Sequence, residues 1–180
     1  MLASALESAS PVTVRSAGVG ALVGEGVPEP ARALATANGL DASAHVAQQM
    51  TGTMLGDADL ILGMARDHRR HVVQALPASV RRAFTLRELA RIADVVEPEL
   101  PRAVEDAGAS TPEDAMRAAV ALAHVMRGSV EPPAVPDDLD VVDPYRRSDD
   151  TYRRSFSQLA PAAQRVAAYL LSAARSVAPA

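Results

Sequence analysis

The sequence predicts an α/β fold in which a parallel sheet is the middle of three layers, with helices on both faces. Three short apolar stretches with strand character, at residues 12–16, 59–64 and 82–86, alternate with segments of helical periodicity. Strands that alternate with helices indicate parallel pairing, because each helix returns the chain to the end of the sheet where the previous strand began. At 180 residues the chain is long enough for one domain with a substantial core, and we expect a single domain over residues 1–180.

The first third of the chain combines one strand pattern with two helical ones. Residues 2–9 have helical spacing but no capping residue in front of them, and the alternation at 12–14 predicts a strand that leads into the glycine-rich stretch 18–26. That stretch opens no helix, so it is a connector rather than a dinucleotide-binding loop. A helix is expected from Pro28, ending at Gly39 in the left-handed conformation.

The middle of the chain carries the clearest alternation. Thr51 is expected to cap a short helix that precedes a buried strand at 59–64. Residues 66–76 have the spacing of an amphipathic helix, with valines and a leucine inward and arginines outward. A further strand at 83–86 runs directly into a helix, which completes the pattern of a covered parallel sheet.

The last part of the chain is predicted to be mostly helical. Thr111 begins a helix with acidic residues in its first turn and an apolar face that includes two methionines. Residues 131–136 are proline-rich and predict an extended linker. Apolar residues at helical spacing from Phe156 to Leu170 predict a long C-terminal helix, which Pro161 should kink or split.

Composition excludes several classes of function. The chain has no cysteine, which excludes disulfides and thiolate metal sites, and it has no lysine. A net charge of −4 with scattered arginines argues against a nucleic-acid or membrane-surface partner, and there is no 18-residue apolar run. The N-terminus does not have a signal-peptide layout, so we expect a cytoplasmic protein. His45, His68 and His71 do not have the spacing of a zinc site; no metal and no cofactor are expected.

The candidate functional stretch is Asp143-Pro144-Tyr145-Arg146, which follows two valines. Proline fixes its own φ and disfavours helical geometry at Asp143, so the carboxylate is held on a rigid turn. A fixed carboxyl group beside an aromatic wall can donate a proton to a leaving oxygen. Asp-Pro is also an ordinary turn or helix start, and both interpretations stay open at this point.

Four segments, in this order, resemble the low-molecular-weight protein tyrosine phosphatases. They are Arg15-Ser16-Ala17-Gly18, the stretch from Asp41 to Thr51, Ala58 to Met64, and Asp143-Pro144-Tyr145. The resemblance covers most of residues 12–86 and 139–171. It implies hydrolysis of phosphotyrosine through a phosphocysteine intermediate, with no cofactor, on the fold predicted above. The substrate implied for the full-length form is a phosphotyrosine protein or a small aryl phosphate.

The resemblance also implies roles for individual residues. Asp143 matches the general acid, Tyr145 and Leu22 match positions of the substrate-pocket wall, and Ser16 and His45 match a hydrogen-bond network that braces the phosphate loop. Three departures accompany these matches. Leu22 falls near a wall position that is often aromatic in the family, which makes the implied pocket less aromatic. Arg146 stands where a second aromatic residue is common, and Ala65 replaces an acidic residue usual after the strand, which puts a local cap or loop contact in doubt.

The nucleophile has no match, since the sequence contains no cysteine. The first strand of the family, its Cys-x5-Arg phosphate loop and the arginine of that loop also have no match, and residues 94–138 are expected to be a helical insertion. We therefore expect the first central strand of the sheet to be missing and this chain to be inactive. An N-terminally truncated phosphatase, with the missing segment encoded upstream of Met1, is the favoured explanation. The alternatives are a catalytically dead relative that acts as a binding module and an unrelated α/β protein; arsenate reductases of the same fold are weaker relatives, because they need resolving cysteines.

Overall fold

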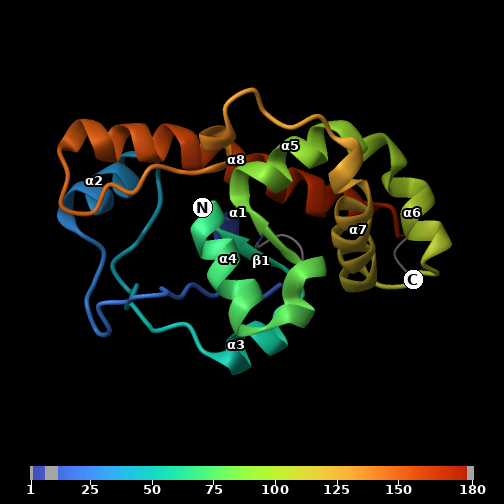
Figure 1. Cartoon of the computed structure of the whole chain (residues 1–180), viewed down its shortest axis with the longest axis horizontal. Coiled ribbons are helices and arrows are strands. Elements are labelled where there is room, and N and C mark those ends of the chain that lie inside the picture. Colours follow the sequence, from blue (N-terminus) through green and yellow to red (C-terminus); the bar gives the residue numbers. More distant parts are fainter. Residues whose placement is uncertain (1, 7–11, 178–180) are drawn as a thin grey trace.

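The computed structural model describes residues 2–6 and 12–177 (Figure 1). Short 3-10 turns, labelled η, connect several of its helices and strands. In chain order the elements are α1 (Leu2–Leu6), α2 (Glu29–Ala37), α3 (Gly52–Asp57), β1 (Ile61–Gly63), α4 (Arg66–Ala75), η1 (Pro77–Arg81), β2 (Ala83–Thr85), α5 (Leu86–Val96), η2 (Glu97–Glu99), α6 (Leu100–Asp106), α7 (Pro112–Met126), η3 (Arg127–Ser129), η4 (Pro136–Leu139) and α8 (Asp149–Arg175). No helix within the described ranges is both long and apolar enough to span a membrane.

The sheet consists of β1 and β2, which pair in parallel as predicted, with Leu62 opposite Phe84. The side chains alternate between the two faces of this sheet. Leu62 and Phe84 belong to the larger core cluster, which α1, α5, α7 and α8 cover. Ile61 and Ala83 belong to a smaller cluster formed with α3 and α4. The prediction of an α/β fold with helices on both faces is confirmed.

The prediction of a strand at residues 12–16 is wrong. This segment is exposed, and it forms no ladder with either strand of the described sheet. Its only strand-like contact follows it, where Gly18 forms an isolated parallel bridge with Gln49. Alternation identifies residues that can form a strand, but a strand also needs a neighbour for its backbone N–H and C=O groups. Within the described part of the chain, no strand pairs with residues 12–16.

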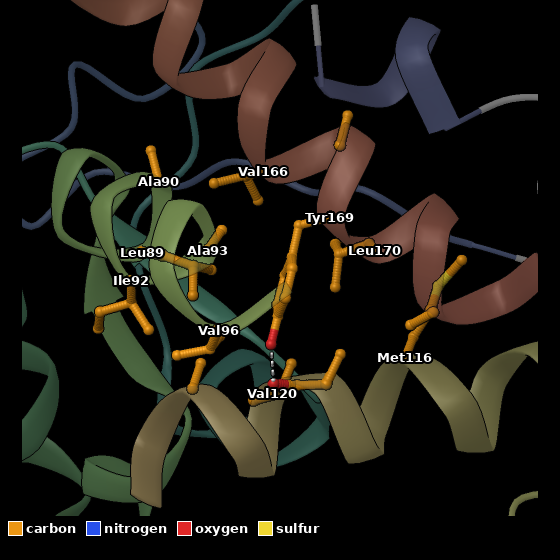
Figure 2. Close-up of a cluster of buried hydrophobic side chains, with 14 of the residues drawn as sticks. Leu89, Ala90, Ile92, Ala93, Val96, Met116, Val120, Val166, Tyr169 and Leu170 are labelled. Carbon is orange, nitrogen blue, oxygen red and sulfur yellow. Dashed lines mark hydrogen bonds between the residues drawn. The ribbon is translucent and has the colours of Figure 1, made fainter. Parts of the chain in front are cut away.

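The main core lies between α5, α7 and α8 (Figure 2). Many of its buried residues are alanines, whose small side chains let the three helices approach closely. Tyr169 of α8 is fully buried at the centre, and its hydroxyl group donates a hydrogen bond of 2.9 Å to the backbone carbonyl of Ala119 in α7. Burial raises the pKa of Tyr169. The long helix α8 continues through Pro161 as one element, so the proline does not split it.

Several predicted helix ends are confirmed in detail. The Thr51 hydroxyl accepts a hydrogen bond from the backbone N–H of Met54 and begins α3. Thr111 caps α7 in the same way. Gly39, just beyond α2, has a φ of +72°, the left-handed conformation that favours glycine at such a position. Thr85 and Glu88 form a capping box at the start of α5, which fixes the point where β2 ends.

Candidate active site

The loop that leads to Asp143 is held at the carboxyl ends of both strands. The backbone N–H of Val141 donates a hydrogen bond of 2.8 Å to the carbonyl of Met64, the residue that follows β1. The Thr85 hydroxyl, at the end of β2, donates to the carbonyl of Leu139 at 2.7 Å. Parallel α/β sheets place their ligands at this end of the strands. The fold therefore fixes the segment before Asp143 at the edge where a site is expected.

A second contact fixes the same loop to the start of α4. The Asp140 carboxylate accepts the backbone N–H of Arg66 at 2.7 Å, and the Arg66 guanidinium donates two hydrogen bonds to the other oxygen at 2.8 and 3.0 Å. Ala65, the N-cap residue of α4, makes no side-chain cap. Asp140 thus supplies, from 74 residues away, the acidic cap that residue 65 lacks.

The ion pair between Asp140 and Arg66 also sets the charge state of the loop. Partial burial of the Asp140 carboxyl group opposes its ionisation, but the hydrogen bonds and charge of Arg66 outweigh this effect. The pKa of Asp140 consequently lies below its ordinary value. Arg87 adds a hydrogen bond of 2.8 Å to the carbonyl of Asp140, so this residue anchors the loop through both its side chain and its backbone.

Asp143 itself is exposed on a tight turn. Its carboxylate accepts a hydrogen bond of 3.0 Å from the backbone N–H of Tyr145, and the N–H of Arg147 closes the turn on the carbonyl of Pro144 at 2.9 Å. Arg146 has a φ of +56°, a conformation that L-residues with side chains rarely adopt. One oxygen of Asp143 is thus used to hold the turn, and the carboxyl group stays open to a ligand.

Tyr145, beside this carboxyl group, can form the wall of a pocket for an aromatic ligand. Its side chain is 43% exposed, and the Arg146 guanidinium lies 5.1 Å from the centre of its ring. A guanidinium above the face of an aromatic ring is attracted by the negative face of that ring. The turn therefore presents a carboxyl group, an aromatic ring and a positive charge within four residues of one segment, at Asp143, Tyr145 and Arg146.

The other predicted site residues lie on a separate pair of segments. Residues 16–25 run beside residues 45–50, joined by backbone hydrogen bonds such as Gly18 N–H to the Gln48 carbonyl at 2.9 Å. The Gln48 side chain donates to the backbone carbonyl of Ser16 at 2.7 Å. Ser16, Leu22 and His45 are all exposed. The Ser16 hydroxyl and the His45 ring have no hydrogen-bond partner among the residues that the structure describes.

The structure therefore brings the predicted residues together only in two groups. No described hydrogen bond or ion pair links Asp143 or Tyr145 to the group of Ser16, Leu22 and His45, so their common site stays a prediction. Sequence reasoning assigned no role to Asp140 or Gln48 and did not predict the positive φ of Arg146. One feature of the sequence could have indicated the role of Asp140. It is an acidic residue three positions before the candidate acid, and an acidic residue is what Ala65 fails to provide as the cap of the following helix. Within the described ranges, no three His, Asp or Glu side chains are placed to hold a metal ion.

The chain is similar in sequence to several curated proteins. A curated relative from Ralstonia nicotianae, a probable low molecular weight protein-tyrosine-phosphatase EpsP, is 37% identical over 87 residues, which are 48% of this chain and 59% of the relative. The low molecular weight protein-tyrosine-phosphatase Ptp of Acinetobacter johnsonii is 32% identical over 75 residues, which are 42% of this chain and 53% of that protein. The chain thus spans little more than half the length of these curated relatives.

Solved structures show the same fold. The tyrosine phosphatase AmsI of Erwinia amylovora superposes with a TM-score of 0.59 at 24% identity, covering 91% of this chain and 76% of that one. Vibrio vulnificus Wzb, solved in complex with benzylphosphonate, gives a TM-score of 0.59 at 21% identity, covering 93% of this chain and 84% of that one. The family model described as low molecular weight phosphotyrosine protein phosphatase matches residues 1–102. Because this match includes more than half of its 180 residues, the chain belongs to the low molecular weight phosphotyrosine protein phosphatase family.

Proposed function

We propose that this chain is the greater part of a protein tyrosine phosphatase that hydrolyses phosphotyrosine through a phosphocysteine intermediate. Asp143 is the general acid that protonates the departing phenol oxygen, and Tyr145 and Leu22 form the wall of the pocket for the substrate ring. Ser16 and His45 brace the phosphate-binding loop. The observation that carries the proposal is the attachment of residues 139–141 to the carboxyl ends of both strands, which positions Asp143 at that edge of the sheet.

The nucleophile is not among the 180 residues, since none of them is cysteine. A phosphocysteine mechanism therefore requires a segment outside this sequence that supplies the thiol and the phosphate-binding loop. Loss of the nucleophile from a covalent enzyme lowers the rate by about 10⁵–10⁶-fold. We propose that this chain alone has no phosphatase activity, and that residues 94–138 are a helical insertion in the family fold, in a single domain over residues 1–180.

A direct test uses an aryl phosphate such as p-nitrophenyl phosphate. The purified 180-residue chain should hydrolyse it no faster than background. The same chain preceded by an apolar strand and a loop of pattern Cys-x5-Arg-Ser/Thr should hydrolyse it, and Asp143→Ala should lower the kcat of that longer protein by about 10²–10⁴-fold. Hydrolysis by the 180-residue chain that Asp143→Ala abolishes would contradict the proposal.

The second candidate is a catalytically dead relative that binds a partner, and the absence of cysteine from the sequence is the observation that favours it. Its distinguishing result is binding of a phosphotyrosine peptide by the 180-residue chain, with no turnover by the longer protein. Saturable binding that Tyr145→Ala weakens, in a protein that stays inactive, would replace the phosphatase proposal with this one.

A further inference from the structure

A second candidate site lies at the opposite end of the sheet from Asp143. A cavity of about 480 Å³ is bounded by α7 on one side and by the residues that immediately precede β1 and β2 on the other. Figure 1 shows α7 standing beside the β1–β2 pair. The cavity is lined by Asp59, Arg81, Arg82, Arg117, Val120, Ala121, His124 and Val125. Its volume lies within the range of about 300–1,000 Å³ that is typical of small-molecule sites.

The cavity has an excess of positive charge. Its one carboxylate, Asp59, is engaged by Arg117 at 2.9 Å, and Arg117 also contacts Asp114 at 3.1 Å. Arg82 donates to the backbone carbonyls of Leu55 and Gly56 rather than to a carboxylate. These carbonyl bonds hold the Arg82 guanidinium in place and leave its charge unneutralised.

Arg81 adds to this excess of positive charge. Arg81 is exposed, and its side chain makes no hydrogen bond or ion pair with any residue that the structure describes. The Nε of Arg82 and the Nδ1 of His124 are buried without a hydrogen-bond partner in the described part of the chain. Buried polar atoms are nearly always paired in native proteins, so these two atoms show that the fold leaves hydrogen-bonding capacity unused in the wall of the cavity. Two neighbouring guanidiniums, at Arg81 and Arg82, thus face the cavity without an acidic partner.

The other wall of the cavity, formed by α7, combines an apolar strip with Arg117 and His124. Val120, Ala121 and Val125 come from α7, and Val125 is 74% exposed, which is unusual for a valine on a helix that packs into the core. An apolar strip opposite a pair of guanidiniums is complementary to a molecule with a hydrophobic body and one anionic head. Carboxylate and phosphate are the groups that the planar fork of arginine binds best.

We propose that this cavity binds a small organic anion, with its carboxylate or phosphate group on Arg81 and Arg82 and its apolar body against Val120, Ala121 and Val125. The family model ends at residue 102, so α7, which supplies the apolar strip, lies outside the matched region. The site is also at the amino ends of the strands, away from the Asp143 turn. It therefore does not depend on the proposed phosphatase activity.

The test is a titration of the isotope-labelled 180-residue chain, followed by the NMR shifts of its backbone amides. Phenyl phosphate and benzoate are the two anionic probes, and benzyl alcohol is the neutral control. We expect at least one anion to shift the amides of residues 81–82 and 120–125 with a Kd of about 1 mM, and the neutral analogue to bind at least about tenfold more weakly. The probe that binds distinguishes a phosphate site from a carboxylate site.

Matched arginine variants test the placement of the charge. Arg81→Gln should weaken anion binding by about tenfold, because it removes a guanidinium that the described fold does not use. Arg102→Gln makes the same change of net charge on α6, where Arg102 is exposed and outside the cavity lining, and should leave the Kd unchanged. The proposal is overturned if neither anion saturates the protein, if the shifts lie around Asp143 instead, if benzyl alcohol binds as well as the anions, or if the two variants have the same effect.

Discussion

The buried hydroxyl group of Tyr169 gives the sharpest test of the core. Tyr169→Phe removes one hydrogen bond, from the hydroxyl to the Ala119 carbonyl at 2.9 Å, and leaves the fully buried ring in place (Figure 2). The Ala119 carbonyl lies within α7, so it keeps its partner in the helix. We expect a loss of about 1 kcal/mol in the free energy of unfolding at pH 7, which lowers the Tm by about 2–4 °C.

At high pH the same substitution should become stabilising, because it removes a group whose ionisation favours the unfolded chain. Burial raises the pKa of Tyr169, so above about pH 10 the unfolded chain loses this proton and the folded chain keeps it. Stability contributed by the protonated group is therefore complete below pH 10 and is lost as the pH rises. By pH 11 the wild-type protein should have lost about 1.4 kcal/mol of its free energy of unfolding through this group, whereas Tyr169→Phe loses nothing. The difference between the two proteins should therefore vanish between pH 10 and pH 11, and at pH 11 the variant should be the more stable by about 0.4 kcal/mol.

Urea unfolding of both proteins at pH 7, 9, 10 and 11, followed by circular dichroism, measures this. The chain is favourable for the experiment because it has no lysine, and ionisation of its other tyrosines is common to both proteins and cancels in the difference. A variant as stable as the wild type at pH 7 would show that the hydroxyl hydrogen bond contributes nothing. A difference that stays constant from pH 7 to pH 11 would refute the assignment of a raised pKa to Tyr169.

Three further substitutions test the loop and the long helix. Asp140→Ala should lower the free energy of unfolding by at least about 1 kcal/mol at pH 7, because it removes the cap on α4. Since the pKa of Asp140 is lowered, this loss should be present above about pH 4 and should fade as the pH falls below that value. Urea titrations measure it, and the control Asp150→Ala should lower the free energy of unfolding by less. Arg146→Gly should be more stable than Arg146→Ala by about 1 kcal/mol, because both lack the guanidinium and only glycine adopts a φ of +56° without strain; equal Tm values would contradict this. Pro161→Ala should increase the free energy of unfolding by up to about 3 kcal/mol and raise the Tm, because it restores a backbone N–H donor at an exposed helical position. A lower Tm would mean that the proline ring is needed there.

The sequence predicted the helices and the two paired strands because their signals are local. Thr51, Thr85 and Thr111 each begin a helix, and a threonine before an apolar periodic segment is a signal that depends on a few neighbouring residues. The strand at 83–85 is buried throughout and the strand at 61–63 is at least half-buried, with an apolar cluster on each face of the pair, which gives the short apolar stretches that the sequence shows. Residues 12–16 carry a similar local signal, but whether such a segment is a strand depends on a neighbour that no local pattern encodes.

The candidate site was predictable only in part, because its geometry depends on contacts between distant segments. The rigid turn at Asp143 followed from Pro144, and the structure adds a hydrogen bond from the Tyr145 N–H to the Asp143 carboxylate. Side-chain bonds from Gln48 and Gln49 join residues 16–21 to residues 48–49, and neither glutamine had a distinguishing pattern. A side chain that bonds to the backbone of a distant loop leaves no periodic signal in the sequence.

The cap on α4 shows why a single departure from a family pattern is weak evidence of a lost contact. The side chain of Ala65 cannot cap α4. Taken alone, alanine at this position predicts unpaired backbone N–H groups at the start of the helix. In the folded chain Asp140 occupies that place and is held there by two strand ends and two arginines. The cap therefore now comes from the loop that carries the candidate acid, so the start of α4 and the position of Asp143 are coupled. A substitution at Asp140 should consequently affect the catalysis of a complete enzyme as well as the stability of this chain.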